Sequence, residues 1–453
     1  MEFSTTLVSG LEALTVRDDE NDNSAPSTEV VAKEAIINTE SAEVSQIDSE
    51  KKVKMSVYFH PTCSKHNIPD HPEHYSRVDG ILATLKKTWP TDLTFRESKM
   101  VTKDQILAFH TPALLGRFLK LADKALQSYE KNKKVEYLNI DMDTTVMWRT
   151  KAAVLHSAGS VISALDHMYA APTDDNKIDT AFCCVRPPGH HAERDKSGGF
   201  CFINNVAIGA KHAQKMHGVE KVAILDYDVH HGNGTEEGFT DDSTVFYGST
   251  HGRDHYPGTG HDPSPFVGEQ ARNEVDRRIV NRLLTPGPKS REDFRTKWGE
   301  ILSEMERFQP QLVIMSSGFD AHDDDPLAEC ELIDEDFAWV TSAILASCAR
   351  VTAALGSEVR YLSVLEGGYD IPAIQRSAVC HVQVMLQGLP PLPSTSSSAV
   401  PGVEAEAGGL EGSSVEVKIG MEATTVVEKE DGELVALREY LEAFGVDDTK
   451  PPA

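Results

Sequence analysis

The segment VAILDYDVHHGNGT, residues 222–235, carries side chains suited to holding a metal ion. It begins with four apolar residues, which predict a buried strand, and it ends in a Gly-rich turn. Asp228 and His230 stand two positions apart after that strand. On an extended segment both side chains point the same way, so a carboxylate and an imidazole converge as two Zn²⁺ ligands do. Taken alone, the pattern fits a hydrogen-bonded strand terminus equally well.

A catalytic zinc site takes three protein ligands and keeps one position open, so a third ligand must come from elsewhere in the chain. In open α/β sheets, ligands bind beyond the carboxyl ends of the strands. His, Asp and Tyr with glycines nearby follow five predicted strands, in the segments RPPGHHA (186–192), DYDVHH (226–231), STH (249–251), SSGFDAH (316–322) and EGGY (366–369). Asp320, in the fourth of these segments, supplies the missing third ligand.

Alternating strand and helix patterns position these segments. Apolar runs predict strands at 55–60, 180–185, 222–225, 244–248, 312–315 and 361–365. Helical spacing predicts a helix entered at 71–77 and others at 103–110, 112–130, 148–169, 205–217, 291–308, 334–355 and 371–387. This alternation is typical of an α/β fold in which helices cover both faces of a parallel sheet.

The charge of the chain is concentrated at its two ends. The formal net charge is -27, and about 17 of the excess negative charges lie in residues 1–52 and 389–453. We expect residues 1–54 to be a disordered acidic tail, 55–388 to be the folded domain, and 389–453 to be a low-complexity acidic tail with a short helix at 433–444. The acidic balance argues against direct nucleic-acid binding, while the tails offer a surface for protein partners.

Cysteine usage and hydropathy bear on the compartment. The seven cysteines form no CxxC pair, which suits reduced thiols inside the cell. We find neither a run of about 18 apolar residues nor a basic region at the N-terminus, so we expect no membrane span and no secretory signal. The segment KKVK, residues 51–54, is too short to decide between nucleus and cytoplasm.

Six motifs resemble those of the zinc-dependent histone deacetylase and acetylpolyamine amidohydrolase superfamily. In chain order they are PGHH (188–191), GFCFINN (199–205), DYDVHHGNGT (226–235), PGTG (257–260), GFDAH (318–322) and EGGY (366–369). The resemblance covers about Ser56 to Gly388. It implies the arginase/deacetylase fold, a single domain with a central eight-stranded parallel sheet, and removal of acetyl or related acyl groups from lysine side chains in protein or peptide substrates.

The resemblance also implies roles for individual residues. Asp228, His230 and Asp320 match the ligands of one catalytic zinc. His191 matches the acid/base, and His190 matches an electrostatic partner that Asp226 orients. Imidazoles suit proton transfer near neutral pH. Tyr369 matches a hydroxyl that donates a hydrogen bond to the developing oxyanion.

Further positions match the substrate channel and a second ion. Gly199, Phe200 and Tyr256 match the walls of a narrow tunnel for an aliphatic lysine stem, and Asp143 matches a residue that holds the substrate backbone, with Asp141 as the alternative. A structural K⁺ site is implied by the Asp226 carbonyl, Asp228, His230, Ser249 and Thr250. We interpret Asp323, Asp324 and Asp325 as a solvated loop. Phe200 and Tyr256 also fit ordinary core aromatics.

Departures from the family pattern indicate which class and which substrate the chain resembles most. Asn233 stands where class I members carry Asp, so the chain resembles class II, and Tyr369 is present where some class II members have His. Leu327 occupies the position that is Glu in polyamine-selective relatives, which weakens that reading. A two-metal Mn²⁺ ureohydrolase of the same fold and a non-catalytic metal-binding scaffold remain as alternatives. We expect the chain to bind one catalytic zinc ion and to be a protein lysine deacetylase.

Overall fold

The computed structural model describes residues 53–261 and 278–389. The predicted N-terminal tail, C-terminal tail and helix at 433–444 lie almost entirely outside these residues, so they remain predictions.

The core of the described region is a single eight-stranded sheet. Its strands are β1 (Met55–Phe59), β2 (Leu93–Glu97), β5 (Thr180–Cys183), β6 (Val222–Asp226), β7 (Val245–Gly252), β8 (Ile279–Leu284), β9 (Leu312–Ser317) and β10 (Arg360–Leu365). They lie in the order β2-β1-β5-β10-β9-β6-β7-β8, and every neighbouring pair is parallel. The expected eight-stranded parallel sheet is confirmed.

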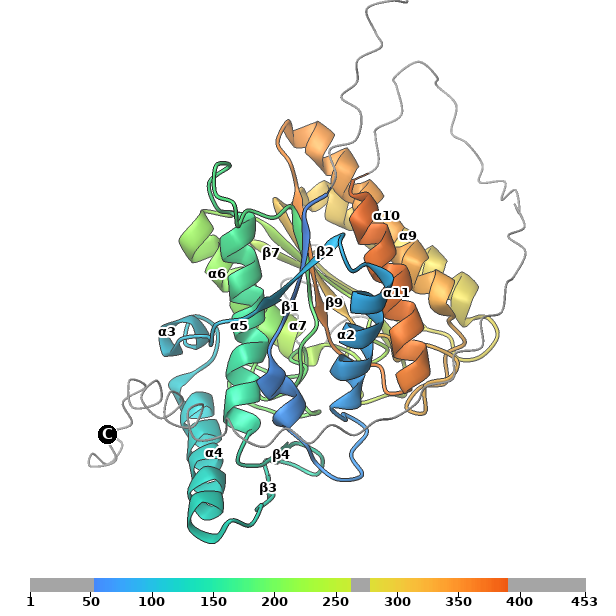
Figure 1. Ribbon diagram of the computed structural model, residues 1–453. Coiled ribbons are helices and arrows are strands. Elements are labelled where there is room, and N and C mark those ends of the chain that lie inside the picture. Colours follow the sequence, from blue (N-terminus) through green and yellow to red (C-terminus); the bar gives the residue numbers. More distant parts are fainter. Residues whose placement is uncertain (1–52, 262–277, 390–453) are drawn as a thin grey trace, which may run out of the picture. The chain divides into compact units, whose positions relative to one another are not determined.

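Helices cover both faces of the sheet, as Figure 1 shows. The helices are α2 (Ser76–Thr88), α3 (Lys103–Ile106), α4 (Pro112–Asn132), α5 (Thr150–Met168), α6 (Asn205–His217), α7 (Asn233–Phe239), α9 (Ser290–Phe308), α10 (Asp334–Leu355) and α11 (Ile371–Gln387), with a 3₁₀ turn, η1 (Pro61–Lys65). One hydrophobic cluster packs α4, α5 and α6 on one face. A second packs α2, α9, α10 and α11 on the other. Because both faces are covered, the central strands are buried along almost their whole length and consist mainly of apolar residues.

Local signals explain where several helices begin and end. The Thr111 hydroxyl accepts the Leu114 N–H at 3.2 Å, and Pro112 follows it at the first helical position of α4. Asp370 caps α11 by accepting the Ala373 N–H at 2.8 Å. Helix α6 ends at Gly218, whose φ of +67° is a left-handed conformation that glycine adopts without strain. These caps define where the three helices begin or end.

Some elements differ from the sequence-based prediction. Edge strands β2 and β8 were missed because LTFRE and IVNRLL mix polar and apolar residues. Helix α7 was missed because it opens on Asn-Gly, which favours turns, and α3 is only four residues long. A short antiparallel pair, β3 (Leu138–Asn139) with β4 (Thr145–Val146), was also missed.

Helix α10 is long and apolar enough to cross a membrane by length and composition. It packs against α9 and α11, and its buried side chains, such as Phe337, Val340 and Ile344, belong to the second cluster. The core helix of a globular domain can be equally long and apolar, so α10 is only weak evidence for a membrane segment.

Candidate metal and acyl-transfer site

Four neighbouring strands deliver the predicted site residues to one edge of the sheet. Strands β5, β10, β9 and β6 lie side by side, and their parallel direction places all four carboxyl ends at the same edge. The segments that follow carry His190 and His191 after β5, Tyr369 after β10, Asp320 after β9, and the Asp228 and His230 pair after β6. The predicted constellation is therefore assembled by topology.

Asp228, His230 and Asp320 form a compact cluster in which all three possible ligand atoms lie within 4.8 Å of one another. The Nδ1 atom of His230 lies 3.1 Å from Asp228 Oδ1 and 3.0 Å from Asp320 Oδ2. Backbone N–H groups orient the carboxylates: Gly367 donates to Asp228 Oδ2 at 2.7 Å, and Val229 donates to Asp320 Oδ1 at 2.8 Å. The residues expected to hold zinc are thus brought together and held in place.

This cluster fits a divalent metal. The Asp228 and Asp320 side chains are fully buried. Burial and the charge of Asp228 raise the pKa of Asp320. Buried charges are paired or bind metals, and two carboxylates with one imidazole are a donor set that Zn²⁺ accepts. Glycines leave the necessary room, because a Cβ at Gly318 would stand 2.1 Å from Asp228 Oδ2 and one at Gly367 2.1 Å from Asp320 Oδ2.

The tandem histidines lie in contrasting environments. His190 Nδ1 lies 3.1 Å from Asp226 Oδ2. Burial alone would lower the pKa of His190, but the carboxylates of Asp228 and Asp226 raise it to about 10. His191 differs, because burial and the neighbouring His190 and His230 hold its pKa well below the usual value. One imidazole is therefore stabilised as a cation and the other as a neutral base.

Asn233 fixes the tautomer of His191. Its Oδ1 atom lies 2.9 Å from His191 Nδ1, and its Nδ2 group donates to Glu193 Oε1 at 2.8 Å. Because Glu193 takes the amide donor, Oδ1 faces the ring and accepts the Nδ1 proton. The Nε2 atom of His191 is then left as the proton acceptor. Glu193 was not predicted from the sequence.

The segment that carries Tyr369 is anchored on two sides. The guanidinium of Arg77 lies 4.9 Å from the centre of the Tyr369 ring, and its Nε group donates to the Gly368 carbonyl at 2.6 Å. The carboxylate of Asp325 accepts the backbone N–H of Tyr369 at 2.6 Å and that of Asp370 at 3.3 Å. These contacts fix the approach of the phenol ring to the site.

The reading of residues 323–325 as a solvated loop is wrong for Asp325. Asp323 and Asp324 have side chains that are 46% and 54% exposed, whereas Asp325 is 5% exposed. Its carboxylate faces inward because the backbone N–H groups of the Tyr369 segment and of Leu327 need an acceptor there. The run of three acidic residues gave no sign in the sequence that Asp325 is buried and Asp323 and Asp324 are exposed.

Further buried side chains support the site without having been predicted. Glu73 accepts from Arg77 at 2.9 Å and from Arg186 at 2.7 and 2.8 Å, and all three residues are buried. The Glu366 carboxylate accepts the backbone N–H groups of Gly189 and His190 at 2.7 and 3.2 Å. Burial raises the pKa of Glu366. These residues tie the segment after β5 to the one after β10.

Aromatic rings stand around His191. The Tyr256 ring lies edge-on at 4.8 Å between ring centres. A Cβ at Gly199 would stand 2.6 Å from Tyr256 Cε1 and 2.7 Å from His191 Cδ2, so only glycine fits between them. The ring centres of Phe200 and Tyr369 lie 5.8 Å apart. Gly199 and Tyr256, which were predicted to line a substrate tunnel, thus lie beside His191, and Phe200 lies beside Tyr369. Leu327, the remaining residue predicted there, is 37% exposed.

The loop before β4 keeps the choice between Asp141 and Asp143 open. Asp141 Oδ1 accepts the backbone N–H groups of Asp143 and Thr144, and its Oδ2 lies 2.9 Å from the Cβ position of Gly198. Burial and the charge of Asp141 raise the pKa of Asp143, which is half-buried. The loop is joined to the site through the Phe200 N–H, which donates to the Thr144 hydroxyl at 3.0 Å. These contacts do not separate the two carboxylates, and Asp143 remains a prediction.

The structure bears on two further ion sites, the predicted K⁺ site and the second metal of the two-metal alternative. Asp226 and Ser249 are partners in the β6–β7 register, but the Ser249 hydroxyl bonds His251 at 2.9 Å and Thr250 accepts from Trp298 at 3.0 Å. The K⁺ site therefore remains a prediction. The two-metal alternative rests on the segment 320–325, in which Asp320, His322 and Asp325 would be metal ligands. The His322 ring lies 2.9 Å from Asp323 and 3.3 Å from Asp334 instead of facing the Asp320 cluster, which disfavours a second metal there.

Comparison with known proteins gives consistent matches. A family model described as "Histone deacetylase domain" matches residues 71–385. Histone deacetylase 14, chloroplastic, of Arabidopsis thaliana is 32% identical over 332 residues, which cover 71% of this chain and 74% of that protein. The crystal structure of the HDA15 HD domain aligns with a TM-score of 0.64 and 28% sequence identity, covering 75% of this chain and 91% of that chain.

Other relatives are much longer. Type-2 histone deacetylase 2 of Dictyostelium discoideum is 30% identical over 378 residues, which cover 75% of this chain but 21% of that protein. The similarity to this relative is therefore confined to one domain of the longer protein.

Proposed function

Because the chain belongs to the histone deacetylase family, we propose that it hydrolyses N-acetyl-lysine side chains of proteins, histone or non-histone, with one zinc ion at Asp228, His230 and Asp320. The observation that carries the proposal is the contrast between the tandem histidines. His190 lies against a carboxylate, whereas His191 lies against the amide of Asn233. A neutral base beside a cationic partner is what amide hydrolysis needs near neutral pH.

Each residue has a separate task in this reaction. When bound, zinc supplies a Lewis acid that polarises the amide carbonyl and activates water. His191 accepts the proton of the attacking water at Nε2 and returns it to the leaving lysine amine. His190 stays protonated against Asp226 and stabilises the developing negative charge. The Tyr369 hydroxyl donates a hydrogen bond to the carbonyl oxygen as its charge grows.

The side chains around His191 favour a long aliphatic substrate arm. Gly199, Phe200 and Tyr256 offer apolar and aromatic surface beside the base, which suits the methylene chain of lysine. A carboxylate from Asp143 or Asp141 would hold the peptide backbone at the rim. The residue expected at the polyamine-selecting position, Leu327, carries no charge for a second substrate amine. Deacylation of acetylpolyamines is therefore the second candidate.

The class and the setting of the enzyme are further parts of the proposal. Asn233 beside His191 supports a class II-like enzyme. We also propose a structural K⁺ near Asp226, residence in the nucleus or cytoplasm, and recruitment of protein partners by the acidic ends. A chain that kept zinc but lacked turnover would instead be a binding scaffold.

Side-by-side kinetics test the proposal. The zinc-loaded chain should show a kcat/KM at least tenfold higher for acetyl-lysine peptides than for acetylspermidine. A preference for acetylspermidine would assign the chain to small amines. Absence of turnover on both substrates at full zinc occupancy would support the scaffold.

A further inference from the structure

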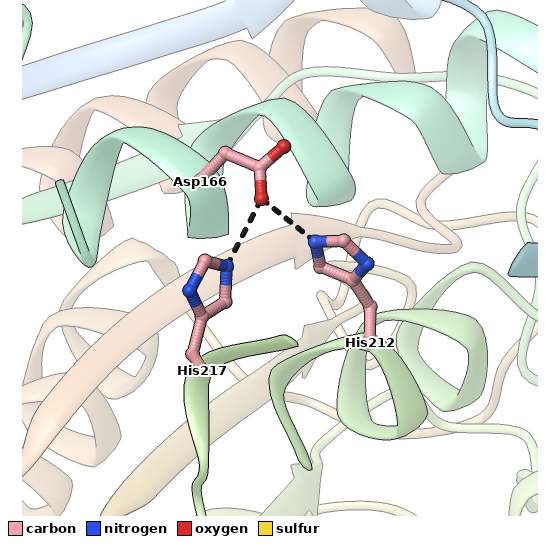
Figure 2. Close-up of side chains that lie close together, drawn as sticks. All are labelled: Asp166, His212 and His217. Atoms are coloured by element: carbon pink, nitrogen blue, oxygen red, sulfur yellow. Dashed lines mark hydrogen bonds and ion pairs between the residues drawn. The ribbon is translucent and has the colours of Figure 1, made fainter. Parts of the chain in front are cut away.

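A second group of metal-binding side chains lies between two helices on the opposite side from the catalytic strand ends. Asp166 stands in the last turn of α5, and His212 and His217 stand in the second half of α6. The Asp166 Oδ1 atom lies 2.7 Å from His212 Nε2 and 3.0 Å from His217 Nε2. Figure 2 shows both rings directing one nitrogen toward this oxygen. We propose that these three residues bind a zinc ion that joins α5 to α6.

The donor set suits zinc. Two imidazole nitrogens and one carboxylate oxygen all lie within 4.8 Å of one another. Tetrahedral Zn²⁺ with bonds of about 2.0–2.1 Å separates its ligand atoms by about 3.3 Å. The two N···O distances, 2.7 and 3.0 Å, are shorter than this by about 0.6 and 0.3 Å, so the carboxylate oxygen must withdraw from both rings when zinc binds. Asp166 can make this movement because its side chain is 51% exposed. Solvent supplies the fourth ligand.

The two rings are already ordered. The His212 side chain is 5% exposed and that of His217 is 16% exposed. Tyr169 stacks on His217 with ring centres 4.9 Å apart and planes 13° apart. The Gln105 amide Nε2 lies 3.5 Å from His212 Nδ1 and donates toward it, which orients this ring in its metal-free tautomer. Because both imidazoles are held in place before binding, little side-chain entropy is lost when a metal binds.

A comparable group near the catalytic site lacks these properties. His322, Asp323 and Asp324 also place ligand atoms within reach of one another. However, Arg376 donates to Asp324 at 3.0 Å and lies 3.5 Å from His322, so a fixed cation already occupies that group. In the described region, the Asp166 carboxylate pairs instead with two imidazoles, which are neutral ligands when deprotonated.

The proton arrangement yields a specific variant. Without metal, each ring donates its Nε2–H to Asp166. Zinc at Nε2 moves that proton to Nδ1, where in His212 it faces the Gln105 amide. The Gln105 oxygen is not free to turn, because it accepts the Thr102 N–H at 2.8 Å in the capping box of α3. Gln105→Glu keeps this cap and gives His212 Nδ1–H an acceptor, which should tighten zinc binding about tenfold.

Zinc stoichiometry tests the proposal on the full chain. Equilibrium dialysis against micromolar Zn²⁺ should give two ions per chain for the unaltered protein, one for Asp166→Asn, one for Asp320→Asn and none for the double variant. Asp195→Asn, which removes another exposed carboxylate, should keep two. Asp166→Asn should also retain turnover on a short acetyl-lysine peptide, because Asp166 lies outside the catalytic machinery.

Stability supplies a second readout. In the Asp320→Asn background, Zn²⁺ should raise the midpoint of thermal unfolding, and this rise should disappear when Asp166→Asn is added. One ion in the unaltered chain, two ions retained in Asp166→Asn, or weaker zinc binding in Gln105→Glu would each overturn the site. Because these readouts measure bound metal, they are independent of whether the chain is a deacetylase.

Discussion

Replacing Asn233 with Asp should move the acid limb of the kcat/KM profile to higher pH. The Asn233 oxygen lies 2.9 Å from His191 Nδ1, and both residues are buried. A carboxylate there would place a negative charge about 4 Å from the centre of the imidazolium charge, worth about 4 kcal/mol at an effective dielectric constant of about 20. That interaction alone would raise the pKa of His191 by about three units, at about 1.36 kcal/mol per unit.

Two opposing effects reduce this shift. The new carboxylate must be buried, and it would face Glu193, which accepts the Asn233 amide at 2.8 Å. We therefore expect a net rise in the pKa of His191 of about one to two units. Since a base must be neutral to accept a proton, the acid limb should rise by the same amount. Adding Glu193→Gln removes the like charge and should leave the acid limb at least as high.

The assay is a pH profile of kcat/KM on an acetyl-lysine peptide at full zinc occupancy. Bound zinc would lower the pKa of His191 in both proteins alike, so the difference between their profiles isolates the substitution. Asn233→Ala should lower the rate without raising the acid limb, because the ring loses its orienting acceptor. An unchanged acid limb in Asn233→Asp, with zinc bound and the fold intact, would refute the role of His191 or its contact with Asn233.

Three further predictions concern Tyr369, Glu73 and the two ends of the chain. Tyr369→Phe should keep zinc and KM while kcat falls by about 10² to 10³; a change confined to KM would contradict the oxyanion role. The pKa of Glu73 is lowered from 4.5 to about 2, because the buried Arg186 and Arg77 outweigh the effect of burial, so Glu73 should contribute about 3 kcal/mol to the free energy of unfolding above pH about 4.5 and lose it as pH falls toward 2. The free energy of unfolding, measured by urea unfolding with a chelator present, should fall in this way with falling pH in the unaltered chain and should depend less on pH in Glu73→Gln. A chain cut to residues 54–388 should fold and keep its kcat and KM on short peptides; loss of soluble protein would show that an end of the chain packs on the domain.

Much of the arrangement of the candidate site could be predicted because its residues follow strands directly. The run at 222–225 predicted β6, and the spacing of Asp228 and His230 placed two candidate ligands on one side of extended backbone. Asp320 could be assigned because β9 and β6 read as parallel strands, whose carboxyl ends share an edge. In these cases a local pattern, combined with the rule for parallel sheets, was enough.

The remaining contacts could not be predicted because they join distant segments. Arg186 meets Glu73 across 113 residues, and Asp325 reaches Tyr369 across 44. No local pattern distinguishes these charged residues from exposed ones, since burial is decided by tertiary packing. The same holds for Asp166 and His212, which are 46 residues apart and meet only because α5 packs against α6.

The most direct test of the central claim is turnover measured together with zinc content for the full chain and for Asp320→Asn. The substrates are an acetyl-lysine peptide panel with acetylspermidine alongside. We predict that the unaltered chain hydrolyses the peptides in preference, and that Asp320→Asn loses one zinc ion and turnover together, because a charged ligand of the metal has been removed. Full zinc occupancy with unchanged turnover in Asp320→Asn would contradict the assignment of the catalytic site.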